Sequence, residues 1–106
     1  MPSIEVGNGI VTHINVFTVA PERQDELVQS LVATVQAARA MPGWISASIR
    51  CSLDGRQVTN YVQFEGREAA QRITQQLLAM GLIQRNTAIG TVSPGEYKVA
   101  FTLARE

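Results

Sequence analysis

An asparagine stands in an otherwise apolar row of one predicted strand. In the run Gln57 to Glu65, alternation puts Asn60 on the face that also carries Val58, Val62 and Phe64. A carboxamide directed into a core costs on the order of 1 to 3 kcal/mol unless it finds a hydrogen-bond partner. Asn60 is therefore a candidate catalytic donor to a substrate oxygen. The alternative is a structural amide that satisfies nearby backbone.

A histidine and a second asparagine share one face of an earlier predicted strand, Ile10 to Val19. His13 and Asn15 alternate there with Phe17, and this face looks toward the helices if Phe17 packs against them. Histidine exchanges protons near neutral pH, so His13 is a candidate general base for an acidic phenol or anthrone. The alternative is a hydrogen-bonded histidine near the start of a strand.

Other side chains are candidates for the wall of a substrate pocket. Trp44 begins a predicted strand, where closing a core end is its simpler role and lining a pocket its second. Arg72 and Arg85 could neutralise a phenolate or carboxylate, although arginines on or after helices are usually solvated. The predicted binding residues are Asn15, Phe17, Trp44, Phe64, Arg72, Met80 and Arg85.

Metal, thiol and phosphate chemistry find little support in the sequence. One cysteine, Cys51, and one histidine are too few for a typical zinc or blue-copper site within one subunit. Cys51 has no base beside it in the sequence. Gly7-Asn8-Gly9 lacks the strand, spacing and helix of a phosphate or dinucleotide loop. We therefore expect no metal, flavin or haem.

The composition indicates one ordinary globular domain over residues 1–106, with residues 1–9 as a flexible lead-in. Hydrophobic residues make up 45% of the chain, charged residues 17%, and nine basic side chains balance nine acidic ones. No run of Lys or Arg could follow a phosphate backbone or an anionic membrane. Neither a signal peptide nor about 18 consecutive apolar residues are present. We expect a cytoplasmic protein that binds neither nucleic acid nor membrane.

Six elements position these residues. Pro21 suits the first turn of a helix, Asp54-Gly55 suits a tight hairpin, and Gly81 suits a helix C-terminal cap. The predicted order is strand Ile10 to Val19, helix from Pro21 to Met41-Pro42-Gly43, strands Trp44 to Ser52 and Gln57 to Glu65, helix Arg67 to Met80, a loop over Gly81 to Ser93, and strand Glu96 to Leu103.

This order is the split βαβ arrangement of ferredoxin-like α+β folds, βαββαβ with a four-stranded antiparallel sheet. Two helices can cover only one face of such a sheet. By alternation we expect Tyr61 and Gln63 on the other face, and an uncovered apolar face favours a homodimer of two packed sheets. The apolar residues expected there are Ile14, Val16 and Thr18, with Ile45, Ala47 and Ile49 or their neighbours.

Three motifs carry a family resemblance: Pro42-Gly43-Trp44, the Ser52-Leu53-Asp54-Gly55 turn, and the run from Asn60 to Glu65, Asn-Tyr-Val-Gln-Phe-Glu. The chain, from about Ile10 to Leu103, resembles the antibiotic biosynthesis monooxygenase family of the dimeric α+β barrel superfamily. The resemblance implies a cofactor-independent oxygenase for aromatic polyketides, such as anthrones or hydroquinones, in secondary metabolism. In such enzymes the electron-rich substrate passes electrons to dioxygen directly.

The resemblance also implies roles and departures. The Asn that matches Asn60 holds a substrate or intermediate oxygen. The residue that matches Phe64 is usually Trp, and a Tyr found about six residues later in anthrone oxygenases is Ala70 here, so two donors are missing. Haem-degrading relatives also carry an Asn where this chain has Asn15, but Arg67 to Met80 has no counterpart of their axial histidine. The alternatives are a polyketide cyclase or isomerase on the same scaffold, and a non-catalytic dimeric small-molecule-binding module.

Overall fold

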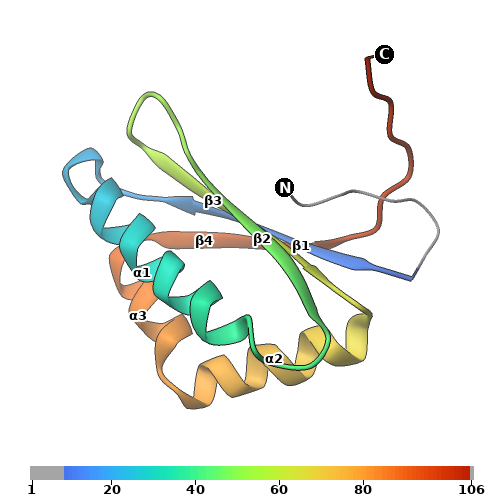
Figure 1. The fold of residues 1–106 in the computed structure, drawn as a ribbon. Helices are drawn as coiled ribbons and strands as arrows, with labels where there is room; N and C mark the ends of the chain where they lie inside the picture. The colour runs from blue at the N-terminus through green and yellow to red at the C-terminus, as the bar shows by residue number, and fades with distance from the viewer. Residues whose placement is uncertain (1–8, 106) are drawn as a thin grey trace.

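The computed structural model describes residues 9–105, and the lead-in expected at residues 1–9 lies outside them except for Gly9. A four-stranded antiparallel sheet in the order β2-β3-β1-β4 carries its helices on one face (Figure 1). This confirms the predicted ferredoxin-like α+β class. The elements are β1 (Val11–Thr18), the 3-10 turn η1 (Pro21–Arg23), α1 (Gln24–Ala38), β2 (Trp44–Cys51), β3 (Gln57–Phe64), α2 (Arg67–Ala79), α3 (Leu82–Ile89) and β4 (Thr91–Tyr97).

The predicted hairpin joins β2 to β3. Gly55 has a φ of +82°, a conformation that glycine adopts without strain. The Asp54 carboxylate accepts hydrogen bonds from the Ser52 hydroxyl at 2.7 Å and from the Arg56 backbone N–H at 3.0 Å. These bonds favour the ionised carboxylate and lower the pKa of Asp54. The turn therefore fixes the pairing of β2 with β3 and, through it, the place of Asn60.

The core between sheet and helices consists of two clusters. One joins α2 to the Phe64 end of β3, and the other joins α1 to the opposite end of the sheet around Phe17. None of the helices formed by residues 9–105 is long and apolar enough to span a membrane. The buried members are Ala38, Val62, Phe64, Ala70, Ile73 and Leu77 in the first cluster, and Phe17, Val19, Leu27, Leu31 and Val58 in the second.

The loop predicted over Gly81 to Ser93 is wrong for most of its length, because α3 occupies Leu82–Ile89. Gly81 takes the left-handed conformation, φ +78°, that ends α2 and lets the chain turn directly into the next helix. Leu82, Ile83 and Ile89 pack against the two core clusters. Asn86 lies on the same side of α3 at helical spacing. Because it is polar, it interrupts the apolar pattern by which a helix is recognised in the sequence.

The last strand also lies earlier than predicted. β4 covers Thr91–Tyr97 and not Glu96 to Leu103, and its pairing with β1 ends at the Thr12–Tyr97 pair. β4 is an edge strand, with a neighbouring strand on one side only. It tolerates Pro94, which has no backbone N–H, because the backbone groups on its open side pair with no other strand. Residues 98–105 lie beyond this pairing. They lack regular structure and extend away from the sheet (Figure 1), leaving Leu103 88% exposed.

The parity expected for β2 is partly wrong. The register shifts between Trp44 and Ser46, which leaves Ile45 as the extra residue of a bulge. Beyond it, Ala47 pairs with Val62 and packs against the first core cluster, so it faces the helices. Ile49 faces them too, and the open face of β2 presents Ser46, Ser48 and Arg50 in place of Ala47 and Ile49.

Candidate active site

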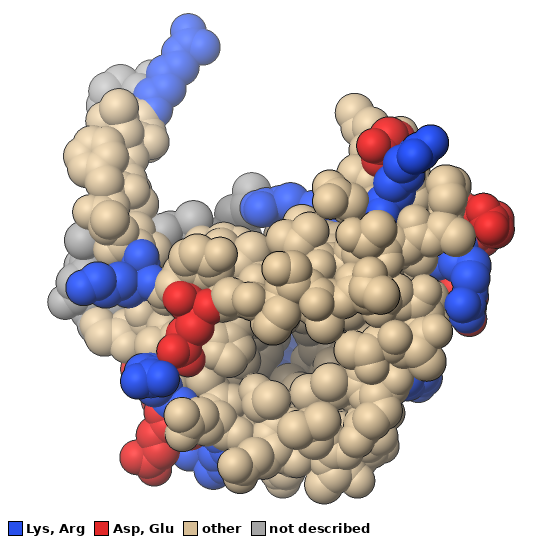
Figure 2. Space-filling model, turned by 180° about the vertical axis from the view of Figure 1, so that it is seen from behind, with Lys and Arg blue, Asp and Glu red and all other residues tan. Residues whose placement is uncertain are grey.

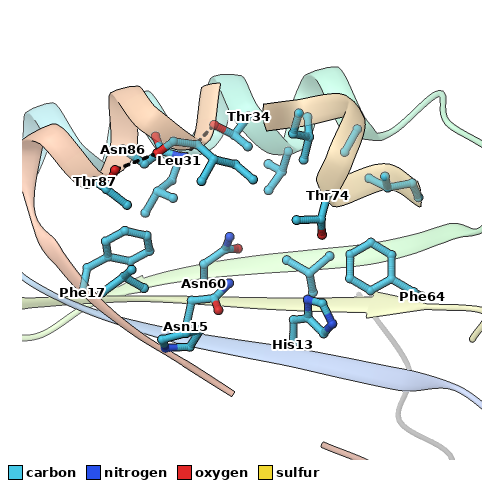
Figure 3. Close-up of a pocket in the computed structure, with 18 of the residues that line it drawn as sticks. His13, Asn15, Phe17, Leu31, Thr34, Asn60, Phe64, Thr74, Asn86 and Thr87 are labelled. Atoms are coloured by element: carbon cyan, nitrogen blue, oxygen red, sulfur yellow. Dashed lines mark hydrogen bonds between the residues drawn. The ribbon is translucent and has the colours of Figure 1, made fainter. Parts of the chain in front are cut away.

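A cavity of about 340 Å³ lies between the sheet and the helices. That volume is in the usual range for a small-molecule site. Figure 3 shows its floor on the strands and its roof on the helices, and most of the lining is apolar. Seen from behind, charged side chains stand toward the margin of the molecule, and the uncharged middle is hollowed (Figure 2). The cavity therefore suits a largely apolar ligand with a few oxygens.

Two amides face each other at the centre of the floor. Asn15 on β1 and Asn60 on β3 are direct cross-strand partners, and both line the cavity (Figure 3). Asn60 is only 7% exposed, and its Oδ1 is buried without a hydrogen-bond partner among residues 9–105. A buried amide without a partner is unusual. The Asn60 oxygen is thus able to accept a hydrogen bond from a ligand without first breaking a bond within residues 9–105.

The candidate base, His13, lies one cross-strand pair further along the same face. Its ring stands edge-on to Phe64, with 5.0 Å between ring centroids. Its Nε2 is 3.4 Å from Oε2 of Glu96, its cross-strand partner on β4, and Oε1 of Glu96 is 3.0 Å from Nε of Arg67. A carboxylate that accepts from Nε2–H leaves Nδ1 as the nitrogen with a free lone pair. In this arrangement His13 is placed as a base, and Glu96 is placed as the group that orients its ring.

Aromatic side chains form part of the cavity wall. Phe17, Trp44 and Phe64 all line the cavity, and Phe17 and Phe64 belong to opposite core clusters. Trp44 and Phe64 are cross-strand partners on β2 and β3. The two rings of Phe17 and Phe64 therefore bound the cavity at its two ends (Figure 3).

Three predicted binding residues are not part of the lining. Arg72 donates from Nη2 to the Pro42 carbonyl at 2.6 Å, which ties α2 to the turn before β2. Met80 caps the end of α2 and is 56% exposed. Arg85 donates from Nε to the Ser30 hydroxyl at 2.9 Å and so joins α3 to α1. These side chains point to structural partners or solvent, and the sequence could not distinguish that from a substrate contact.

Sequence reasoning missed the polar part of the roof. Thr34, Thr74, Asn86 and Thr87 line the cavity from the three helices (Figure 3). Asn86 is 3% exposed; its Oδ1 accepts from the Ser30 hydroxyl at 2.5 Å, and its Nδ2 donates to Thr34 Oγ1 at 3.0 Å. Helical spacing from Leu82 and Ile83 was the signal that could have placed Asn86 inside.

No group of three or more His, Cys, Asp or Glu side chains in the described part of the chain is placed to hold a metal ion. The polar groups of the lining residues are amides, hydroxyls, one imidazole and one indole N–H, all of which suit oxygen atoms of an organic ligand.

The sequence model of the antibiotic biosynthesis monooxygenase family matches residues 10–76. The chain belongs to this family. The match includes β1, the hairpin and most of α2, and therefore both floor amides and His13. α3, with the polar roof residues Asn86 and Thr87, lies beyond the matched part.

Tetracenomycin-F1 monooxygenase from Streptomyces glaucescens is 46% identical over 65 residues, which are 60% of this chain and 58% of that protein. Less than two thirds of that relative is thus matched.

Solved structures share the fold. A variant of SnoaB, a cofactor-independent oxygenase from Streptomyces nogalater, aligns with a TM-score of 0.80 at 21% identity, over 92% of this chain and 99% of that chain. The monooxygenase ActVA-Orf6 of Streptomyces coelicolor, in complex with Nanaomycin D, aligns with a TM-score of 0.77 at 23% identity, over 92% and 93%. At these identities the likeness concerns the fold.

Proposed function

We propose that this protein is a cofactor-independent monooxygenase that acts on an aromatic, polyketide-type substrate such as an anthrone or a hydroquinone. The observation that carries the proposal is the buried amide of Asn60, whose Oδ1 has no hydrogen-bond partner among residues 9–105 and which lies beside Asn15 and His13 in an apolar cavity. The family to which the chain belongs supports the reaction class, and so do the names of its relatives.

The reaction needs one base and a dry site. Nδ1 of His13 takes a proton from the CH₂ carbon of the central ring of an anthrone. The negative charge then moves to the oxygen of the anthrone carbonyl. The amides of Asn15 and Asn60 donate hydrogen bonds to that oxygen where little water competes. The electron-rich anion reduces dioxygen, and a C–O bond forms at the carbon that lost the proton. Loss of water from the resulting hydroperoxide leaves a carbonyl, so anthrone and O₂ give anthraquinone and H₂O.

The two departures from the usual family pattern change the walls of the site. Phe64 is 4% exposed and supplies an apolar surface without a donor. Ala70 is fully buried within the first core cluster, so a larger side chain there would have to displace core residues. Donors to the substrate must therefore come from the amides of the floor, the roof, or another wall residue.

A cyclase or isomerase is the second candidate. His13, with Glu96 behind it, is equipped to move a proton, and that step alone requires no oxygen. A non-catalytic binding module would use the same cavity without turnover. Oxygen consumption separates the oxygenase from these two functions, and product formation separates the cyclase from the binding module.

The test follows dithranol, a dihydroxyanthrone, and linear polyketide analogues in air and under argon, with dialysed protein and a metal chelator present. The oxygenase predicts consumption of O₂ and formation of the anthraquinone danthron, both lost under argon and both lowered in His13→Gln. Product from a polyketide analogue that forms equally under argon would favour the cyclase. Binding without any product would favour the binding module.

We also propose that the protein is a homodimer whose sheets pack face to face. The open face carries the partly exposed Ile14 and Val16, and Tyr97 is 52% exposed at its edge. We expect sedimentation at micromolar concentration to give a mass near twice 11.5 kDa. A measured mass near that of a single chain, 11.5 kDa, would show that the protein is a monomer and contradict this proposal.

A further inference from the structure

One buried donor in the cavity wall takes no part in the mechanism above. The indole Nε1 of Trp44 is buried and has no hydrogen-bond partner among residues 9–105. Trp44 is the chain's single tryptophan, and its side chain lines the cavity. Buried indole N–H groups normally find an acceptor. A ligand oxygen is the acceptor that a cavity residue can acquire.

The position of Trp44 places this donor near the proposed base. Trp44 on β2 pairs with Phe64 on β3. The ring centroid of Phe64 lies 5.0 Å from that of His13 on β1, the next strand of the sheet. Across the sheet the order is therefore Trp44, Phe64, His13, all at one end of the cavity. The amide pair of Asn15 and Asn60 lies further along the strands, toward the middle of the sheet.

We propose that Trp44 donates its indole N–H to a second oxygen of the substrate, at the end of the molecule that lies over Phe64. This inference rests on the proposed function, and it narrows the substrate class to fused aromatic compounds with oxygens on at least two separate rings. One oxygen meets the amides of Asn15 and Asn60, and the other meets Trp44. A site built to bond a substrate oxygen discriminates strongly against analogues that lack it, because its own polar group is then left unpaired.

The experiment uses the single indole as a reporter. In a ¹H–¹⁵N spectrum of the full chain only Trp44 gives an indole N–H signal, and danthron serves as a ligand that is not turned over. We expect danthron to move this signal to lower field, as a new hydrogen bond does. Trp44→Phe keeps a ring and deletes the donor, and we expect its affinity for danthron to fall several-fold to about tenfold.

A donor exchange provides the matched control. The double variant Trp44→Phe, Phe64→Trp returns one indole to the same end of the cavity from the facing strand. We expect it to recover part of the affinity lost in Trp44→Phe. Phe64→Trp alone adds bulk without removing the original donor, and it measures the steric effect of the new ring.

The outcomes separate this inference from the proposed function. If danthron shifts the backbone signals of Asn60 and Phe64 while the indole signal stays in place, and Trp44→Phe binds as the wild type does, the Trp44 inference is wrong and the site stands. If danthron shifts no cavity signal and dithranol is not consumed, the proposed function fails and takes this inference with it. The indole measurement uses the unmodified protein, so it holds even where a variant folds poorly.

Discussion

Asn60→Ala should remove activity and leave the fold almost unchanged. Asn60 is only 7% exposed, and its Oδ1 has no hydrogen-bond partner in the described part of the chain. Its removal ends a desolvation cost of about 1 to 3 kcal/mol, which offsets the packing lost beside an existing cavity. We expect the free energy of unfolding to change by less than about 1 kcal/mol. Loss of an oxyanion donor typically costs about 10²- to 10³-fold in kcat, or roughly 2.7 to 4 kcal/mol of barrier.

Asn86→Ala is the matched control, because the chain places a second buried asparagine in the same cavity. Its amide bonds to Ser30 and to Thr34, and its truncation leaves those hydroxyls with fewer partners. We expect a loss of about 1 to 3 kcal/mol of stability. For a domain of this size that corresponds to a fall in Tm of roughly 4 to 8 °C per kcal/mol.

The assay pairs thermal unfolding of both variants with dithranol turnover, measured as kcat and KM in air. We expect Asn60→Ala to show a large fall in kcat with a small change in Tm, and Asn86→Ala to show a clear fall in Tm. If Asn60→Ala melts as far below the wild type as Asn86→Ala does while kcat is kept, Asn60 is a structural amide and the site assignment is refuted.

Three further predictions test neighbouring parts of the argument. Glu96→Gln keeps the size of the side chain but removes the carboxylate that contacts His13 and Arg67, so kcat should fall while KM changes little; an unchanged kcat would exclude Glu96 as the orienting group. Gly43→Ala should lower Tm clearly, since Gly43 has a φ of +95° and the added Cβ would lie 2.4 Å from a side chain of α2; an unchanged Tm would show that the turn relaxes freely. The pKa of Asp54 is lowered in the folded state, so its contribution to stability is present above the usual carboxyl pKa and is lost as pH falls through the lowered value; the Tm gap between wild type and Asp54→Ala should close on acidification, and a gap constant with pH would contradict this.

The sequence was most informative where a structure is encoded locally. The turn after Asp54 needs a positive φ at Gly55, which glycine allows without strain, and alternation along β1 and β3 then brings Asn15 and Asn60 to one face. These short-range signals were enough to predict the ferredoxin-like order and the floor of the cavity.

The parts that failed depend on distant partners. The pairing of β4 with β1 ends at the Thr12–Tyr97 pair, and no property of the alternating run beyond Tyr97 records that limit. α3 was missed because its inward position 86 is an asparagine, whose burial is satisfied by Ser30 and Thr34, 56 and 52 residues away in the sequence. Polar side chains held by long-range hydrogen bonds look like surface residues until the fold is known.

The bulge at Ile45 absorbs one extra residue and so lets both ends of β2 face the cavity side of the sheet. Trp44 and Ala47 both face the helices although they lie three positions apart, which regular alternation does not allow. A substitution at Ile45 changes one side chain, which is 37% exposed. Deletion of Ile45 would turn the shifted pairing into a regular one, in which Trp44 still pairs with Phe64, Ser46 still pairs with Gln63, and Ala47 and Ile49 keep facing the helices. Straightening the strand with Ile45 retained would instead turn Ala47 and Ile49 outward. Among relatives of this chain, a pocket of this kind is therefore compatible with the loss of one residue between Trp44 and Ser46, provided that the bulge is lost with it.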